Sequence, residues 1–128
     1  MEHKKEHISF FTDEKSADYD IIDRCLVIRM KQDVDHHLAL SIREKSDFLI
    51  EKRNIRNIIF DFDLVNFMDS SGVGLIMGRY KRVIFTGGNV AITNVSSSID
   101  RIFKLSGLYK IIKKYDVMEE AVEELRVL

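Results

Sequence analysis

The residues with the clearest chemical potential lie together in one short segment. Residues 69–72 read Asp-Ser-Ser-Gly, and further glycines follow at positions 74 and 78. Aspartate and serine side chains accept hydrogen bonds from the free amides at a helix start, so a helix cap is the simplest interpretation of this string. An exposed serine at such a position can also accept a phosphate, because the dianion would lie at the positive end of the helix dipole.

The glycines suggest more than a cap. A glycine inside a helix costs about 1 kcal/mol relative to alanine, and Gly74 and Gly78 lie on one face of the predicted helix. Such a cost is usually offset by the close approach of another backbone, which is either the domain's own sheet or a partner protein. Gly72 keeps the loop tip open beside the serines. A phosphate there would oppose docking of a partner through repulsion and desolvation, which is typical of a switch in protein binding.

The elements that position this segment follow from the hydrophobic pattern. Residues 58–60 form a short apolar run typical of a strand buried on both faces, and a helix is predicted from about residue 70 to residue 85, ended by Gly87 and Gly88. The pattern also predicts strands at 19–23, 25–30 and 89–93, a short strand at 111–112, and helices at about 36–49, 97–105 and 117–125. We expect Asp35 to cap the first helix and Asp116 to begin the last one. Strands that alternate with helices predict an α/β fold, with a mixed central sheet of four to five strands and about four helices packed against it.

The chain length suits a single domain. The first 18 residues are mostly polar and charged, with Ile8, Phe10 and Phe11 as an apolar cluster. We expect residues 1–18 to be an arm that is either flexible or forms an extra edge strand, and residues 19–128 to form the domain.

The composition excludes several classes of function. There are 20 Lys and Arg residues against 21 Asp and Glu, so the net charge of −1 gives little attraction to nucleic acid. The single cysteine excludes an internal disulfide and favours a reducing compartment. The N-terminus does not resemble a secretory signal, and no apolar run approaches the ~20 residues of a membrane span. We therefore expect a cytoplasmic protein that binds neither nucleic acid nor membrane.

The residues that could serve an enzyme lack the necessary spacing. His36 and His37 point about 100° apart on a helix and have no further ligand at metal spacing, so no metal site is expected. Ser71 is not in a Gly-x-Ser-x-Gly elbow, and the glycines from 72 to 78 lack the Gly-Lys-Ser/Thr of a phosphate loop. Cys25 fits a core position. We predict no catalytic residue and no cofactor, and therefore no enzyme.

Three segments together resemble a known family. Residues 69–72, with Phe-Met before them and Gly-Arg-Tyr-Lys at 78–81, resemble the motif of STAS-domain anti-anti-sigma factors, above all those of stage II sporulation in endospore-forming bacteria. Val-Asp-His-His at 34–37 resembles the start of the family's first helix, and residues 105–112 resemble its C-terminal motif. The three matches occur in the family's order and spacing. One departure is Gln32, which stands where the family usually has glycine.

The resemblance implies partner switching. Unphosphorylated members of this family bind an anti-sigma factor that is also a serine kinase, and thereby release the sigma factor. The kinase uses ATP to phosphorylate the second serine of the motif, here Ser71, and a PP2C-type serine phosphatase reverses the reaction. The chain itself would be a substrate and a ligand rather than a catalyst.

The resemblance also implies a partner-binding surface around the phosphorylated serine, with Arg79 reaching across to the partner. Its residues would be Asp35, Asp69, Ser70, Ser71, Gly72, Gly74 and Arg79. Two alternatives stay open. One is a STAS interaction module of another circuit, such as stress response or phosphatase control. The other is a STAS binding domain in which Ser71 is not phosphorylated and only caps a helix.

Overall fold

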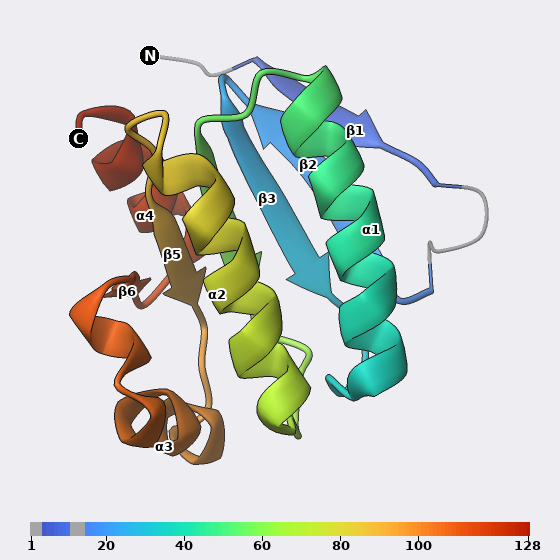
Figure 1. Ribbon diagram of the computed structural model, residues 1–128, viewed down its shortest axis with the longest axis vertical. Coiled ribbons are helices and arrows are strands. Elements are labelled where there is room, and N and C mark those ends of the chain that lie inside the picture. The colour runs from blue at the N-terminus through green and yellow to red at the C-terminus, as the bar shows by residue number, and fades with distance from the viewer. Residues whose placement is uncertain (1–3, 11–14) are drawn as a thin grey trace.

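One mixed sheet forms the centre of the molecule (Figure 1). The structure, a computed structural model, describes residues 4–10 and 15–128, and within them the sheet has six strands in the order of the sequence. The strands are β1 (Lys5–Ile8), β2 (Ala17–Ile22), β3 (Cys25–Met30), β4 (Asn57–Asp61), β5 (Val90–Thr93) and β6 (Lys113–Tyr115). From β1 to β3 the pairs are antiparallel, and from β3 to β6 they are parallel.

Helices make the connections between the parallel strands, because such strands cannot be joined by a tight turn. They are α1 (His36–Lys52), α2 (Ser70–Ile84) and α3 (Ser97–Ser106), the last followed by a short 3-10 helix, η1 (Leu108–Lys110). A fourth helix, α4 (Met118–Arg126), ends the chain. Figure 1 shows α1 and α2 side by side on one face of the sheet, with α4 on the other.

Alternate residues of the central strands face the two helical layers. In β3, Leu26, Ile28 and Met30 belong to the larger core under α1 and α2, whereas Cys25 and Val27 belong to the smaller core under α4. β4 is buried at every position, as its continuous apolar run predicts for a parallel strand covered on both faces. This double burial fixes the strand register and so the positions of the loops that follow β3 and β4.

A charged cluster joins α3 to the segments that follow it. The Asp100 carboxylate accepts hydrogen bonds from the Tyr109 hydroxyl and from Lys114 Nζ at 2.8 Å, and Lys104 Nζ lies 3.0 Å away. The hydrogen bond from Lys114, followed by those from Tyr109 and Lys104, holds the pKa of Asp100 well below its usual range. The carboxylate is therefore ionised at neutral pH and links α3, η1 and β6.

The α/β fold predicted from the sequence is confirmed, with a larger sheet than expected. Residues 5–8 of the predicted arm form β1, whose His7 Nδ1 lies 2.9 Å from Asp20 Oδ1 on β2. The strand expected at 111–112 lies at 113–115 instead, because Ile111 and Ile112 are bonded back to Leu108 in η1. Phe11, the third member of the apolar cluster in the predicted arm, lies outside the described residues.

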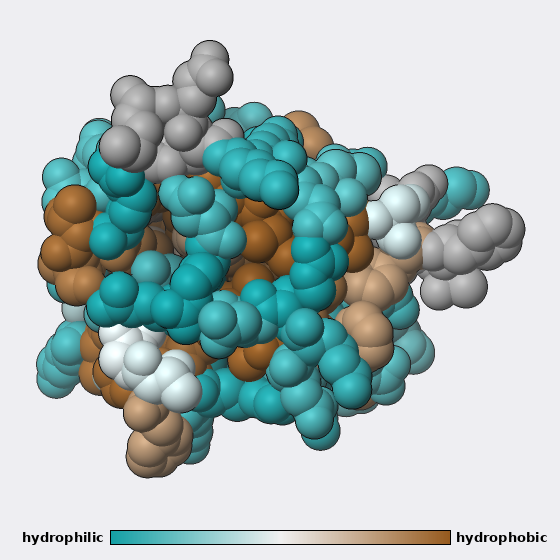
Figure 2. Space-filling model, turned by 90° about the horizontal axis from the view of Figure 1, so that it is seen from above, coloured by the Kyte–Doolittle hydropathy of each residue, from teal (hydrophilic) through white to brown (hydrophobic). Residues whose placement is uncertain are grey.

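The surface at one end of the molecule is seen in Figure 2, which looks onto the end where the parallel strands begin. In the centre of this face, hydrophobic atoms lie recessed between hydrophilic side chains. None of the described helices is long and apolar enough to cross a membrane.

Candidate functional site

The site forms where the loops after β3 and β4 meet. Parallel neighbouring strands end at the same edge of a sheet, so the loops that enter α1 and α2 lie next to each other. Val34 and Met68 form a parallel bridge between these loops, and the Asp69 amide donates to the Val34 carbonyl at 3.0 Å. The Asp33 carboxylate adds two further bonds, at 3.0 Å each, from the amides of Asn66 and Phe67. The two helix starts are thereby held side by side.

Aspartates cap both helix starts. Asp35 Oδ1 accepts the Leu38 amide at 2.9 Å, as expected from the sequence, and Asp69 Oδ1 accepts the Ser71 amide at 2.8 Å. Hydrogen bonds from the Ser71 side chain and then from its amide lower the pKa of Asp69 below its usual value, and the nearby His36 contributes a smaller effect in the same direction. Asp69 is therefore an ionised acceptor that fixes both the backbone and the hydroxyl of Ser71.

Ser71 borders a hollow between α1 and α2. Its side chain is partly exposed, whereas Ser70 beside it is exposed. The hollow has a volume of about 300 Å³ and is lined by His36, Ala39, Leu40, Arg43, Ser71, Gly74 and Leu75. The predicted phosphate acceptor thus lies at an open, partly basic groove rather than in the core.

The three glycines of this segment have different environments. Gly72 is buried, and a Cβ there would lie 2.2 Å from Met68 Sδ, so this glycine packs inward beneath the site. Gly74 is exposed and Gly78 half-buried, and a Cβ at either position would meet nothing within 4 Å. The domain's own sheet therefore does not explain Gly74 and Gly78.

Arg79 lies away from the predicted surface, which corrects the expectation that it reaches across to a partner. Its side chain is 7% exposed, and its Nε lies 2.9 Å from Asp47 Oδ1 on α1. Arg82 Nη1 also approaches Asp47, at 3.4 Å. Burial lowers the pKa of Arg79 and the Asp47 charge opposes that shift, so the guanidinium stays ionised and paired. Arg79 therefore holds α2 against α1, and the physical reason is that it faces α1 within the helix pair.

Sequence analysis missed the residues that α1 contributes to the hollow. His36, Leu40 and Arg43 all line it. Their spacing of four and then three residues places them on one face of a helix, which was a usable signal. Hydrophobic periodicity indicates only the buried face of α1, so it does not single out these three exposed positions.

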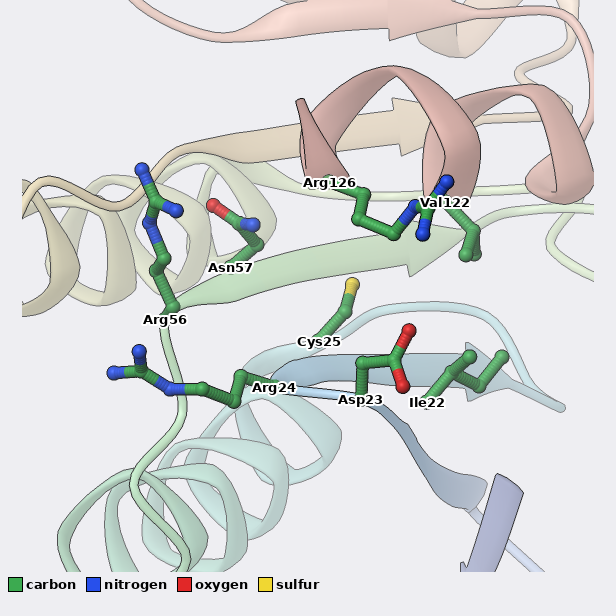
Figure 3. Close-up of a pocket in the computed structure, with 8 residues that line it drawn as sticks. All are labelled: Ile22, Asp23, Arg24, Cys25, Arg56, Asn57, Val122 and Arg126. Carbon is green, nitrogen blue, oxygen red and sulfur yellow. The ribbon is translucent and has the colours of Figure 1, made fainter. Parts of the chain in front are cut away.

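A second hollow lies at the opposite end of the molecule, where β3 and β4 begin (Figure 3). Its volume is about 150 Å³, and the Cys25 sulfur points into it between Asn57 and Arg126. Burial, with a smaller effect of Asp23, raises the pKa of the Cys25 thiol to about 12, so the thiol is protonated and a poor nucleophile. The guanidinium groups of Arg24 and Arg56 point away from the sulfur.

The described titratable side chains do not gather in the pattern of a metal site. Among residues 4–10 and 15–128, no group of three or more His, Cys, Asp or Glu side chains could hold a metal ion. His36 and His37 contact each other with ring centroids 6.0 Å apart and have no third partner of that kind.

The comparison with known proteins places the chain in a family. Residues 16–121 match the STAS domain, and the chain belongs to this family. It is 37% identical over 103 residues to the anti-sigma F factor antagonist of Paenibacillus polymyxa. The aligned region covers 80% of this chain and 88% of that protein.

Solved structures show the same likeness over nearly the whole chain. The unphosphorylated form of the anti-sigma factor antagonist SpoIIAA superimposes with a TM-score of 0.69 at 26% identity, covering 99% of this chain and all of that one. The phosphorylated form of the Bacillus cell fate determinant SpoIIAA superimposes with a TM-score of 0.66 at 28% identity, covering 96% of this chain and 98% of that one.

Proposed function

We propose that the protein is an anti-sigma factor antagonist that works by partner switching. Its unphosphorylated form binds an anti-sigma factor and so releases the sigma factor, and a phosphate on Ser71 abolishes that binding. The similarity to anti-sigma factor antagonists supports the antagonist role. A solved phosphorylated form of SpoIIAA supports phosphorylation as the control.

One observation favours Ser71 as a regulated residue over Ser71 as a helix cap. The capping acceptor of α2 is the Asp69 carboxylate, which binds the Ser71 amide. Within the described part of the chain, no backbone amide donates to the Ser71 hydroxyl, which instead bonds to Asp69. The hydroxyl is therefore dispensable for the cap and is presented, partly exposed, at the rim of the hollow.

The proposed partner surface is the area around the two helix starts. Asp69 and Ser70 precede Ser71 in the chain, Asp35 lies at the neighbouring helix start, and the exposed Gly74 continues the surface along α2. Gly72 supports this surface from below through its contact with Met68. We assign Arg79 a role inside the domain, because its guanidinium pairs with Asp47.

The chemistry of the switch follows from local electrostatics. A phosphate adds about −1.5 to −2 charge at neutral pH next to the ionised Asp69. A partner surface that fits the neutral serine would have to desolvate this dianion, which is costly unless new cations pair with it. The proposed partners are an anti-sigma factor with serine kinase activity, which uses the ATP, and a PP2C-type phosphatase that restores the serine. The protein acts in the cytoplasm as their ligand and substrate, without a cofactor of its own.

The test combines mass spectrometry with a binding measurement. The purified protein is incubated with its candidate anti-sigma kinase and ATP, and the products are mapped by peptide mass spectrometry and run on a sizing column. We expect one phosphate on Ser71 and loss of the complex. Ser71→Ala should bind without being phosphorylated, and Ser70→Ala, which alters the exposed neighbour, should still be phosphorylated.

Other outcomes would point to the alternatives. Binding without phosphorylation would indicate a constitutive STAS binding domain. Neither binding nor phosphorylation with this kinase, but both with a kinase of a stress-response or phosphatase-controlling circuit, would assign the module to that circuit. Stoichiometric phosphate on Ser71→Ala would show that another residue is the acceptor.

A further inference from the structure

The hollow between α1 and α2 contains two basic side chains that the proposed function does not use. His36 and Arg43 line it from α1, opposite Ser71 and Gly74 of α2. They are seven residues apart, which is about two helical turns or 10 Å along α1. Both face the same groove, so they flank the space next to the Ser71 hydroxyl.

Among residues 4–10 and 15–128, no carboxylate pairs with the positive charge of Arg43. In the part of the chain that the structure describes, Arg43 forms no ion pair, although it is close enough to Arg79 to affect that residue electrostatically. Asp47, the carboxylate deeper in the helix pair, is already shared by Arg79 and Arg82. The groove beside Ser71 therefore has an unused guanidinium group.

We propose that the phosphate on Ser71 is held in this hollow by Arg43, with His36 as the second contact, instead of projecting into solvent. The inference rests on the proposed phosphorylation of Ser71 and names the residues that receive the phosphate. A guanidinium group binds phosphate through two parallel N–H donors, a geometry that a lysine cannot reproduce. The bound phosphate occupies part of the groove beside Ser71, so phosphorylation blocks the docking surface by occupancy as well as by charge.

The charges that surround the phosphate act in opposite directions. The carboxylates of Asp69 and Asp35, at the two helix starts, favour the singly charged form of the phosphate and raise its second pKa. Arg43 and His36 favour the doubly charged form and lower it. The absolute pKa of the phosphate is therefore uninformative, whereas the change caused by removing one cation is diagnostic.

The test places phosphoserine at position 71 during protein synthesis, so that it needs no kinase. The second pKa of the phosphate, about 6 in a free phosphoserine, is measured by ³¹P NMR titration. Removing a unit charge that contacts the phosphate, about 4 Å away, shifts its pKa by roughly 0.7 unit in a water-like dielectric, against roughly 0.4 unit for a charge about 7 Å away. We therefore expect Arg43→Gln to raise the pKa of the phosphate by at least about 0.7 unit. Arg43 is the primary target because its guanidinium group offers the paired N–H donors of the proposed contact.

Lys52→Gln is the matched control. Lys52 is an exposed cation at the other end of α1, so its replacement changes the net charge equally without reaching the hollow. A pKa that stays the same in Lys52→Gln and rises in Arg43→Gln supports the proposal. Equal pKa values in both variants would overturn it, because the phosphate would then not contact Arg43. This result does not depend on whether any kinase phosphorylates Ser71, so the two proposals fail separately.

Discussion

Replacement of Gly74 by alanine should stabilise the domain. Gly74 lies inside α2, and an added Cβ would meet no heavy atom within 4 Å. The whole helix-propensity difference is therefore gained, about 1 kcal/mol in the free energy of unfolding, which corresponds to a melting temperature about 4 °C higher. Urea unfolding followed by circular dichroism measures it. Gly107→Ala is the control, since this site is equally open but has φ +75°, where alanine costs about 1–2 kcal/mol.

Partner binding gives the second half of this prediction. Because the domain's own sheet does not approach Gly74, the presence of glycine at this helical position is explained if a partner backbone lies against α2 there. Gly74→Ala should then weaken binding to the anti-sigma factor at least about tenfold while it stabilises the free domain. Gly78→Ala, outside the hollow, should stabilise α2 and leave binding unchanged. A less stable Gly74→Ala would refute the structural argument, and a stable variant with unchanged affinity would refute the partner contact.

Three further predictions concern charge and burial. Asp47→Asn leaves the buried Arg79 guanidinium without its counter-charge and should lower the free energy of unfolding by about 2 kcal/mol, as measured by chemical denaturation. Fully retained stability would show that this ion pair is not needed. Because the pKa of Asp100 is depressed in the folded protein, its contribution to stability is present above its unfolded pKa of about 4 and is lost as the pH falls below that value. Asp100→Asn should therefore reduce the acid dependence of the melting temperature between about pH 2 and 5. An unchanged acid dependence would contradict the role of the cluster around Asp100. The Cys25 thiol should react with a thiol reagent at pH 8 only after unfolding, and rapid reaction of the native protein would contradict its burial.

The sequence predicts the parts of the fold that depend on local pattern. The apolar run in β4, the glycines after α2 and the Asp35 cap were all found, because each depends on a few neighbouring residues. The sequence leaves residues 5–8 open between arm and edge strand because they are mostly exposed, and their contacts are with distant segments: pairing with β2, the ion pair of Glu6 with Arg53, and the packing of Ile8 against the core. The Asp116 cap was wrong: the N-cap of α4 is Val117, and the Asp116 carbonyl is occupied by the Asn94 amide from the loop after β5.

In the candidate site, too, features set by neighbouring residues are predictable from the sequence, whereas contacts between distant residues are not. Asp69 and Ser71 are candidates from the Asp-Ser-Ser-Gly string, and the structure brings Asp35 to the same edge through the bridge between Val34 and Met68, while the phosphorylation of Ser71 stays a prediction. Arg79 was misplaced because a sequence cannot tell which cation on a helix meets a carboxylate on the neighbouring helix. A charged residue at a motif position is easily assigned to a partner, whereas here the pairing is inside the domain.

The contacts around Ser71 form a frame on which the proposed phosphorylation would act. The Asp33 carboxylate and the backbone bonds of Val34 fix the two helix starts, and the pair of Asp47 and Arg79 fixes the helices further along. None of these contacts uses the Ser71 hydroxyl, so a phosphate there leaves all of them intact. A switch of this kind needs no conformational change, because a dianion at the groove is enough to alter what can dock there.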